Sequence, residues 1–365
     1  MCHERLAVLA SVPAAWGTYA PAVRFAYTRS PAPLPVLLFA LAQYAVASAA
    51  LIVGTLCCGS STEHNTAPAA RAGAELGAYL FIGNWLQLTG QVSLPATRVA
   101  FLVQTTTLLV PLLQAATAEP GARASAVPAR TWLACVLAFA GVMILSSHPT
   151  VSVTTDGAHP RISLWLDPSD GLVLGSTLLY SLHVVRLSAL APGVPPLRLA
   201  TAKALTECTL ALTCLVTTLL LLPNSTAAME TRAFTSLLLA GAPGMWRQAH
   251  LTLAVATVWC GAVPIAYTMW AQSYGQRSSV ISPTHANLIY TTQPLWSTLA
   301  AWALLDEVLS ISELVGAAAI GAALWLTATA RPRGAPLGRS LGDASCAARF
   351  LDDHDDHEPL LKRVV

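Results

Sequence analysis

The chain has 365 residues, of which 55% are hydrophobic and only 10% are charged, and its mean hydropathy is +0.58. This composition excludes a soluble globular domain and indicates an integral, multi-pass membrane protein. The net charge of +2 and the presence of only two lysines, Lys203 and Lys362, exclude a basic surface for nucleic acid.

Ten apolar segments follow one another along the chain, each near the roughly 20 residues that span a bilayer. They cover residues 6–23, 34–58, 74–93, 96–117, 130–147, 169–190, 197–222, 249–273, 281–304 and 312–329. We therefore predict an all-α integral membrane fold of ten transmembrane helices. A shorter apolar piece, residues 233–246, is expected at the membrane interface or in a loop.

The sequence repeats itself. Pro95-Ala96-Thr97-Arg98 and the later run FLVQTTTLLVPLL match Pro283-Thr284-His285 and the later run NLIYTTQPLWSTL. In the same way, TWLACVLAFAGVMIL in segment 130–147 matches ELVGAAAIGAALWL in segment 312–329. Each repeat has an odd number of spans, so the two halves have opposite topology, a recurring transporter design. We predict inverted five-helix repeats at 1–148 and 168–330, an outer loop at 149–167 and a disordered tail at 331–365.

The distribution of Lys and Arg favours cytoplasmic termini, because the loops and tail on the N-terminal side hold more of them. The polar tail ends in DDHDDHEPLLKRVV and has no core to bury. Within it, Asp356, Leu360 and Leu361 have the spacing of an acidic dileucine sorting signal, and a solvated acidic tail without a signal is the alternative. The compartment stays open between endomembrane or vacuole, plasma membrane and plastid envelope.

Ionisable residues inside apolar segments are functional candidates, because a charge at the bilayer centre costs roughly 2.5–3.5 kcal/mol on insertion scales. Glu207 lies well inside segment 197–222, with Lys203 one turn earlier on the same face. We predict either a proton-coupling carboxylate or a helix-internal ion pair that reaches the cytoplasmic face. Arg98 and His285 open corresponding segments of the repeats. They are predicted to contact a solute, with interface snorkelling and packing as the alternatives.

The stretch 282–328 resembles the end of an EamA-like domain of the drug/metabolite transporter superfamily. The matching features are Pro283-Thr284, a mid-helix proline at Pro294, the acidic turn Asp306-Glu307, and the glycines Gly316 and Gly321 of the last helix. The resemblance extends over most of the chain, through Trp16-Gly17, residues 75–113 and Asp170-Gly171. The family usually has a basic residue and a small pair where this chain has His285, Ala286 and Asn287.

The resemblance implies a central cavity lined by the third, fourth, eighth and ninth apolar segments. Trp16 of the first segment, at the position of the family's WG pair, is added to the predicted site. Polar residues there form the predicted substrate-binding set: Trp16, Asn84, Gln87, Arg98, Gln104, Trp270, Gln272, His285, Asn287, Tyr290 and Gln293. Each uncharged polar member has an alternative role in a helix-to-helix hydrogen bond worth about 0.6 kcal/mol.

The sequence thus favours a secondary transporter of a small organic metabolite, driven by an ion gradient, for example of protons, or by exchange, since no GxxxxGK[ST] pattern is present. A nucleotide-sugar or sugar-phosphate exchanger and a non-transporting receptor or scaffold are the alternatives. An enzyme is not expected, because HExxH and GxSxG patterns are absent. No cofactor or metal is expected, because the eight cysteines form no pair of CxxC motifs. Ala317 and Gly321 favour close helix packing, within the monomer or in a homodimer.

If the dileucine signal is read, the double substitution Leu360→Ala and Leu361→Ala should move the protein from an internal compartment to the cell surface. Fluorescence microscopy of the tagged protein measures the change. An unchanged subcellular distribution would contradict the sorting signal and favour a solvated acidic tail without a signal.

Overall fold

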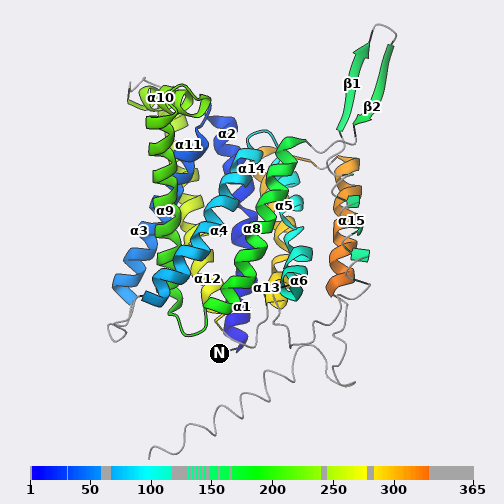
Figure 1. Ribbon diagram of the computed structural model, residues 1–365. Coiled ribbons are helices and arrows are strands. Elements are labelled where there is room, and N and C mark those ends of the chain that lie inside the picture. Colours follow the sequence, from blue (N-terminus) through cyan, green and yellow to red (C-terminus); the bar gives the residue numbers. More distant parts are fainter. Residues whose placement is uncertain are drawn as a thin grey trace, which may run out of the picture.

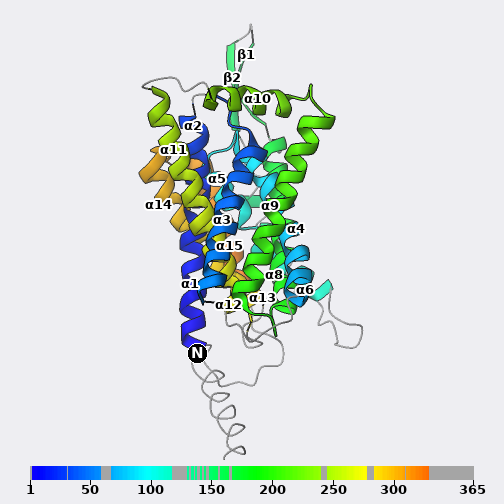
Figure 2. The ribbon, with the colours of Figure 1, turned by 90° about the vertical axis from the view of Figure 1, so that its left-hand side faces the viewer.

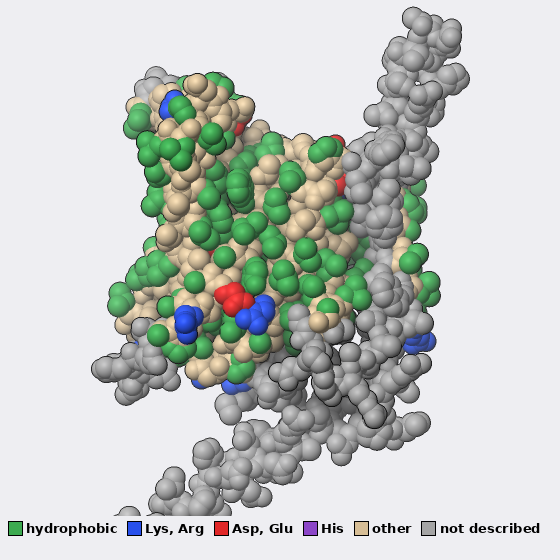
Figure 3. Space-filling view, in the orientation of Figure 1, with side chains coloured by type: hydrophobic (Ala, Val, Ile, Leu, Met, Phe, Trp, Pro, Cys, Tyr) green, Lys and Arg blue, Asp and Glu red, His purple; other side chains and the backbone are tan. Residues whose placement is uncertain are grey.

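A computed structural model of the chain describes residues 2–30, 32–58, 67–116, 130, 133–134, 136–137, 140–141, 144, 148–154, 157–163, 167–239, 245–277, 283–308 and 310–328. These residues are mostly helical, and the helices stand side by side in one bundle (Figure 1). Apolar side chains cover much of the face seen in Figure 3, and the few charged ones in that view lie toward its two ends. Such a surface suits hydrocarbon surroundings.

The first half contains α1 (Cys2–Gly17), α2 (Tyr19–Arg29), α3 (Val36–Cys58), α4 (Ala67–Gln91), α5 (Ala96–Val103) and α6 (Thr106–Ala116). The predicted outer loop 149–167 is largely an antiparallel hairpin of β1 (His148–Thr154) and β2 (Gly157–Ser163), paired from His148–Ser163 to Thr154–Gly157. The hairpin extends from one end of the bundle in Figure 1. Its β-branched run, TVSVT, favours extended backbone and explains the departure from an all-α chain.

The second half contains α8 (Pro168–Leu190), α9 (Pro196–Leu221), α10 (Thr226–Leu239), α11 (Met245–Cys260), the π-helix η1 (Gly261–Tyr267), α12 (Thr268–Gly275), α13 (Pro283–Tyr290), α14 (Gln293–Leu305) and α15 (Ile311–Ala328). Helix α10 includes the first part of the piece predicted at the interface. It lies across the end of the bundle in both ribbon views (Figures 1 and 2). Arg232 ties it to α9 by donating to the carbonyls of Leu219 and Pro223.

Six stretches of helix within the described residues are long and apolar enough to cross a membrane. They are Glu4–Arg29, Val36–Cys57, Ala96–Gln114, Pro168–Leu190, Pro196–Leu221 and His250–Gly275. Of the other predicted spans, 74–93 lies in α4, 281–304 is divided between α13 and α14, and 312–329 is α15; only isolated residues of 130–147 are described. The multi-pass helical membrane class is therefore confirmed, and the count of ten spans stays a prediction.

Glycines on α4 determine how closely it approaches α9. A Cβ on Gly77 would lie 2.7 Å from Thr206 Cβ and 2.8 Å from the Lys203 carbonyl oxygen, and one on Gly73 would meet Ala202. Gly73 and Gly77 are one turn apart, the small-xxx-small spacing that lets helix backbones pack closely. This contact brings the ionisable stretch of α9 against the helix that contains Asn84.

Candidate functional site

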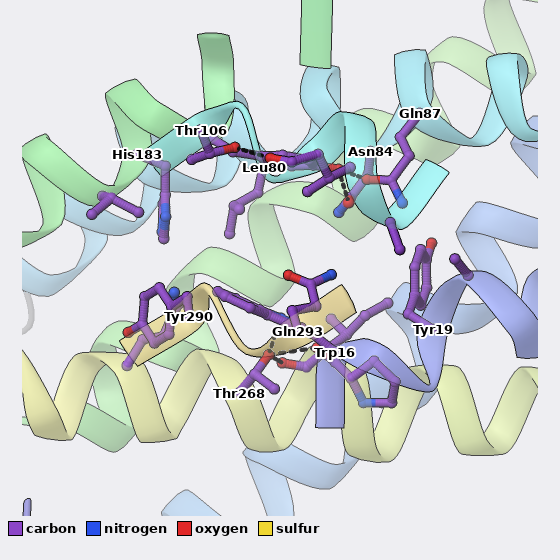
Figure 4. A pocket seen from close by; sticks show the side chains of 18 of the residues that line it. Trp16, Tyr19, Leu80, Asn84, Gln87, Thr106, His183, Thr268, Tyr290 and Gln293 are labelled. Atoms are coloured by element: carbon purple, nitrogen blue, oxygen red, sulfur yellow. Dashed lines mark hydrogen bonds between the residues drawn. The ribbon is translucent and has the colours of Figure 1, made fainter. Parts of the chain in front are cut away.

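A cavity of about 110 Å³ lies among the helices of the bundle, lined by residues of α1, α2, α4, α5, α6, α8, η1, α12, α13 and α14. An ordered water occupies about 10–15 Å³ on this measure, so the cavity has room for several waters or part of a small solute. Seven predicted substrate-binding residues line it: Trp16, Asn84, Gln87, Gln104, Gln272, Tyr290 and Gln293. Figure 4 shows Asn84, Gln87, Thr106 and His183 on one wall, with Trp16, Thr268, Tyr290 and Gln293 on the facing wall.

Two interrupted helices meet at this cavity. Helix α5 ends at Val103 and α6 begins at Thr106, while α13 ends at Tyr290 and α14 begins at Gln293. Pro294 has no N–H to return to the carbonyl four residues earlier, so the Tyr290 carbonyl loses its helical donor. Gln104 replaces that donor: its Nε2 lies 3.2 Å from the Tyr290 oxygen. A side chain from one break therefore satisfies the backbone of the other.

A third irregular element, the π-helix η1, forms part of the facing wall. It contains Pro264. The Thr268 hydroxyl donates to the Pro264 carbonyl oxygen at a distance of 2.5 Å. The Thr268 hydroxyl also accepts from Trp16 Nε1 at 3.0 Å, which fixes the indole beside the cavity. Single-turn π segments inside helices occur frequently at functional sites, because the widened turn redirects side chains.

Asn84 joins the cavity to the buried carboxylate of Glu207. Its Nδ2 donates to Glu207 Oε1 at 3.1 Å, and its Oδ1 accepts from the Tyr180 hydroxyl at 2.7 Å. The Tyr180 hydroxyl also lies 2.9 Å from Gln87 Oε1. Asn84, Tyr180 and Gln87 line the cavity, whereas Glu207 lies behind them, fully buried, with no partner in the described structure for Oε2.

Lys203 is also fully buried, but it forms no ion pair with Glu207. Its Nζ lies 3.4 Å from the Met269 carbonyl oxygen on α12. The structure therefore keeps both predicted coupling residues inside the bundle and gives them different partners. An ion pair that reaches the cytoplasmic face, the alternative reading, does not fit this arrangement.

Arg98 does not line the cavity. Its Nε lies 2.9 Å from Asp170 Oδ1 and its second terminal nitrogen 2.5 Å from Oδ2, a bidentate ion pair with both side chains fully buried. Nearby, the Glu307 carboxylate accepts hydrogen bonds from the backbone N–H groups of Ala96 and Thr97 at the start of α5. Both N–O distances are 3.2 Å. These contacts join the starts of α5 and α8 to the end of α14. Arg98 therefore holds one end of the bundle together, and neither predicted role, solute contact or snorkelling, describes it.

The remaining predicted residues lie elsewhere. Trp270 is outside the cavity lining and stacks on Tyr274, with ring centroids 5.6 Å apart. His285 and Asn287 belong to α13, but their side chains lie outside the described part of the chain, as do Asp356, Leu360 and Leu361. The structure adds lining residues that the sequence did not single out, notably Tyr19, Tyr180 and His183. Their one signal in the sequence is a polar atom within an apolar helix.

No protein-family model matches the chain. No curated protein matches it either. Among solved structures, 19 chains match. One of them, titled "Crystal structure of protein", aligns over 90% of this chain and 97% of its own length, with a TM-score of 0.55 and 18% sequence identity. A likeness at this identity shows a shared fold and carries no statement about activity.

Asp170→Asn should destabilise the protein by about 3–5 kcal/mol, because it leaves the guanidinium of Arg98 buried without its counter-charge. The melting temperature of the purified protein in detergent measures the effect. Asp306→Asn is the matched control, since Asp306 forms no ion pair within the described structure and asparagine also tolerates its left-handed backbone, with φ of 55°.

The double variant Arg98→Met with Asp170→Leu should recover most of the lost stability, because it leaves no unpaired charge. An unchanged melting temperature for Asp170→Asn would show that the pair does not hold the two helix starts together.

Proposed function

We propose that the chain is a secondary transporter that moves a small organic solute by alternating access, of the EamA-like kind that its sequence resembles. The observation that carries the proposal is the meeting of two interrupted helices at a polar cavity inside an apolar bundle. Transporters recurrently place their sites near the bilayer midplane, at discontinuous helices between repeats. Non-helical backbone at membrane depth is tolerated only where protein or a watery cavity satisfies it.

Two features support the inverted repeat. The breaks after Val103 and Tyr290 fall, to within one residue, at corresponding places of the repeated sequence. Helices of each half also pack against the first helix of the other half. Helices α5 and α6 contact α8, the first helix of the second half, and α13 and α14 contact α1, the first helix of the first half. Helix α3 contacts its counterpart α9. A two-fold relation between the repeats would generate these pairings.

We expect ten spans with both termini cytoplasmic. Figure 1 shows the N-terminus at one end of the bundle and the hairpin and α10 at the other, as loops after five and seven spans would lie. Protease added to the cytoplasmic face of sealed membranes should therefore remove an epitope placed at Val365. Removal of that epitope by protease on the opposite face would contradict the orientation.

Uptake by the purified protein in liposomes, screened over amino acids, nucleosides, sugars and amines, tests the transport proposal. A transporter should accumulate at least one solute with saturable kinetics that protein-free liposomes lack. Saturable binding without uptake of the same solute would instead favour the receptor alternative.

We further propose that Glu207 couples transport to protons. Protonation would turn one carboxylate oxygen from an acceptor into a donor. The Asn84 amide, which now donates to charged Glu207, would then donate to a neutral and weaker acceptor, and the network with Tyr180 and Gln87 would be disturbed. Among the described residues, the titratable groups in electrostatic contact with this carboxylate are Lys203, Tyr44, Tyr180 and Cys208.

Glu207→Gln should therefore flatten the pH dependence of uptake while exchange of solute survives, since glutamine does not titrate. The measurement is uptake and counterflow over a series of pH values. Glu230→Gln on α10, outside the cavity lining, is the matched control and should keep the original profile. A Glu207→Gln protein with normal abundance and an unaltered profile would rule out the coupling role.

A further inference from the structure

The cavity carries no formal charge on its lining side chains. None of the described residues that line it is Lys, Arg, Asp or Glu. The nearby cations are already engaged: Arg98 pairs with Asp170, and Lys203 donates to the Met269 carbonyl. A phosphate or carboxylate entering this site would lose its water without gaining a cation, and buried charges need pairing or several hydrogen bonds.

The lining nevertheless offers both hydrogen-bond donors and hydrogen-bond acceptors that have no partner among the described residues. Within the described structure, no partner is present for Gln87 Nε2, for Gln104 Oε1 or for either polar atom of the Gln293 amide. His183 belongs to the lining and is 2% exposed, and its Nε2 is buried with no partner there. In Figure 4 the His183 ring points across the cavity toward the wall with Tyr290. A buried polar atom such as His183 Nε2 is normally satisfied, so a ligand that completes it, together with the free glutamine groups, gains specificity.

An apolar surface lies beside these groups. The rings of Trp16 and Tyr290 meet edge to face with centroids 4.9 Å apart, and Val103 and Ile265 also line the cavity. Small-molecule sites commonly combine such apolar walls with a few convergent polar groups.

We infer that the solute is uncharged, carries both hydrogen-bond donors and acceptors, and has an aromatic or apolar face. This inference rests on the proposed transport function and names its substrate class. It disfavours the nucleotide-sugar or sugar-phosphate exchanger, whose substrates carry phosphate and would need a cation in the lining.

The test compares matched pairs of probes that differ mainly in charge: uridine with uridine monophosphate, nicotinamide with nicotinate, and glucose with glucose 6-phosphate. Binding to the purified full-length protein is measured as a shift in melting temperature over a concentration series. The uncharged member of at least one pair should bind at least ten-fold more tightly than its anionic partner. Binding of an anionic member as tight as that of its uncharged partner, or no binding by any uncharged probe, overturns the inference.

Two lining variants sharpen the comparison. Gln87→Leu should weaken binding of the preferred uncharged probe about ten-fold, whereas Thr89→Val, an exposed residue on the same helix, should leave it unchanged. Gln293→Arg should move the preference of a pair toward its anionic member by at least ten-fold, with the uncharged Gln293→Met as its control at the same position. Equal preferences in Gln293→Arg and the wild type would count against the inference.

Uptake of the same probes separates the two proposals. If an uncharged probe binds and is not transported, the transport proposal fails and the substrate class stands. If only anionic probes are transported, transport stands and the uncharged class fails.

Discussion

Backbone hydrogen bonding in an apolar environment is the constraint on which the cavity depends. Pro294 removes one donor from the helix that begins at Pro283, so the carbonyl of Tyr290 needs a partner from outside its own helix. Gln104 supplies that partner from the matching break in the other half of the chain. The interruption at Tyr290 is therefore stabilised by a side chain from the interruption after Val103, and polar groups from both line the cavity.

The few charges of the bundle are kept away from this cavity. Arg98 and Asp170 neutralise each other at one end, where Asp170 also accepts from the Asp167 backbone N–H as part of the cap of α8. Glu75 and Arg186 form a second ion pair, with side chains about one-third or more exposed. Exposed pairs of this kind are worth at most about 1 kcal/mol, whereas breaking a buried pair is costly. The buried pair thus sets helix positions, and the cavity is left to uncharged amides and hydroxyls.

Glu207 is the exception, because it is a buried acid that reaches the cavity only through Asn84. The close approach of α4 to α9 at Gly73 and Gly77 makes that contact geometrically feasible, since bulkier side chains there would hold the helices apart. A buried carboxylate that is half satisfied, next to side chains with free hydrogen-bonding capacity, can connect protonation to solute binding. A second buried ionisable group, Lys203, donates to a backbone carbonyl, so the two are not locked into one neutral unit.

The membrane class and most helix positions follow from the sequence, because apolar runs of bilayer length and helix-interrupting prolines are local properties. Polar residues of the segments that line the cavity in the family the chain resembles, with Trp16 from the first segment, predicted seven members of the lining, among them Gln104, Tyr290 and Gln293. Other lining residues were missed, among them Tyr19, Tyr180 and His183, because an amphipathic ring in an apolar helix also suits ordinary packing. Only the tertiary structure showed that Arg98 pairs with Asp170, and that Lys203 donates to the Met269 carbonyl on α12 and forms no ion pair with Glu207. It also showed that Trp270 lies outside the cavity lining. The reason is physical: a side chain chooses its partner by position in space, and these partners lie on other helices, which the spacing along one helix does not reveal.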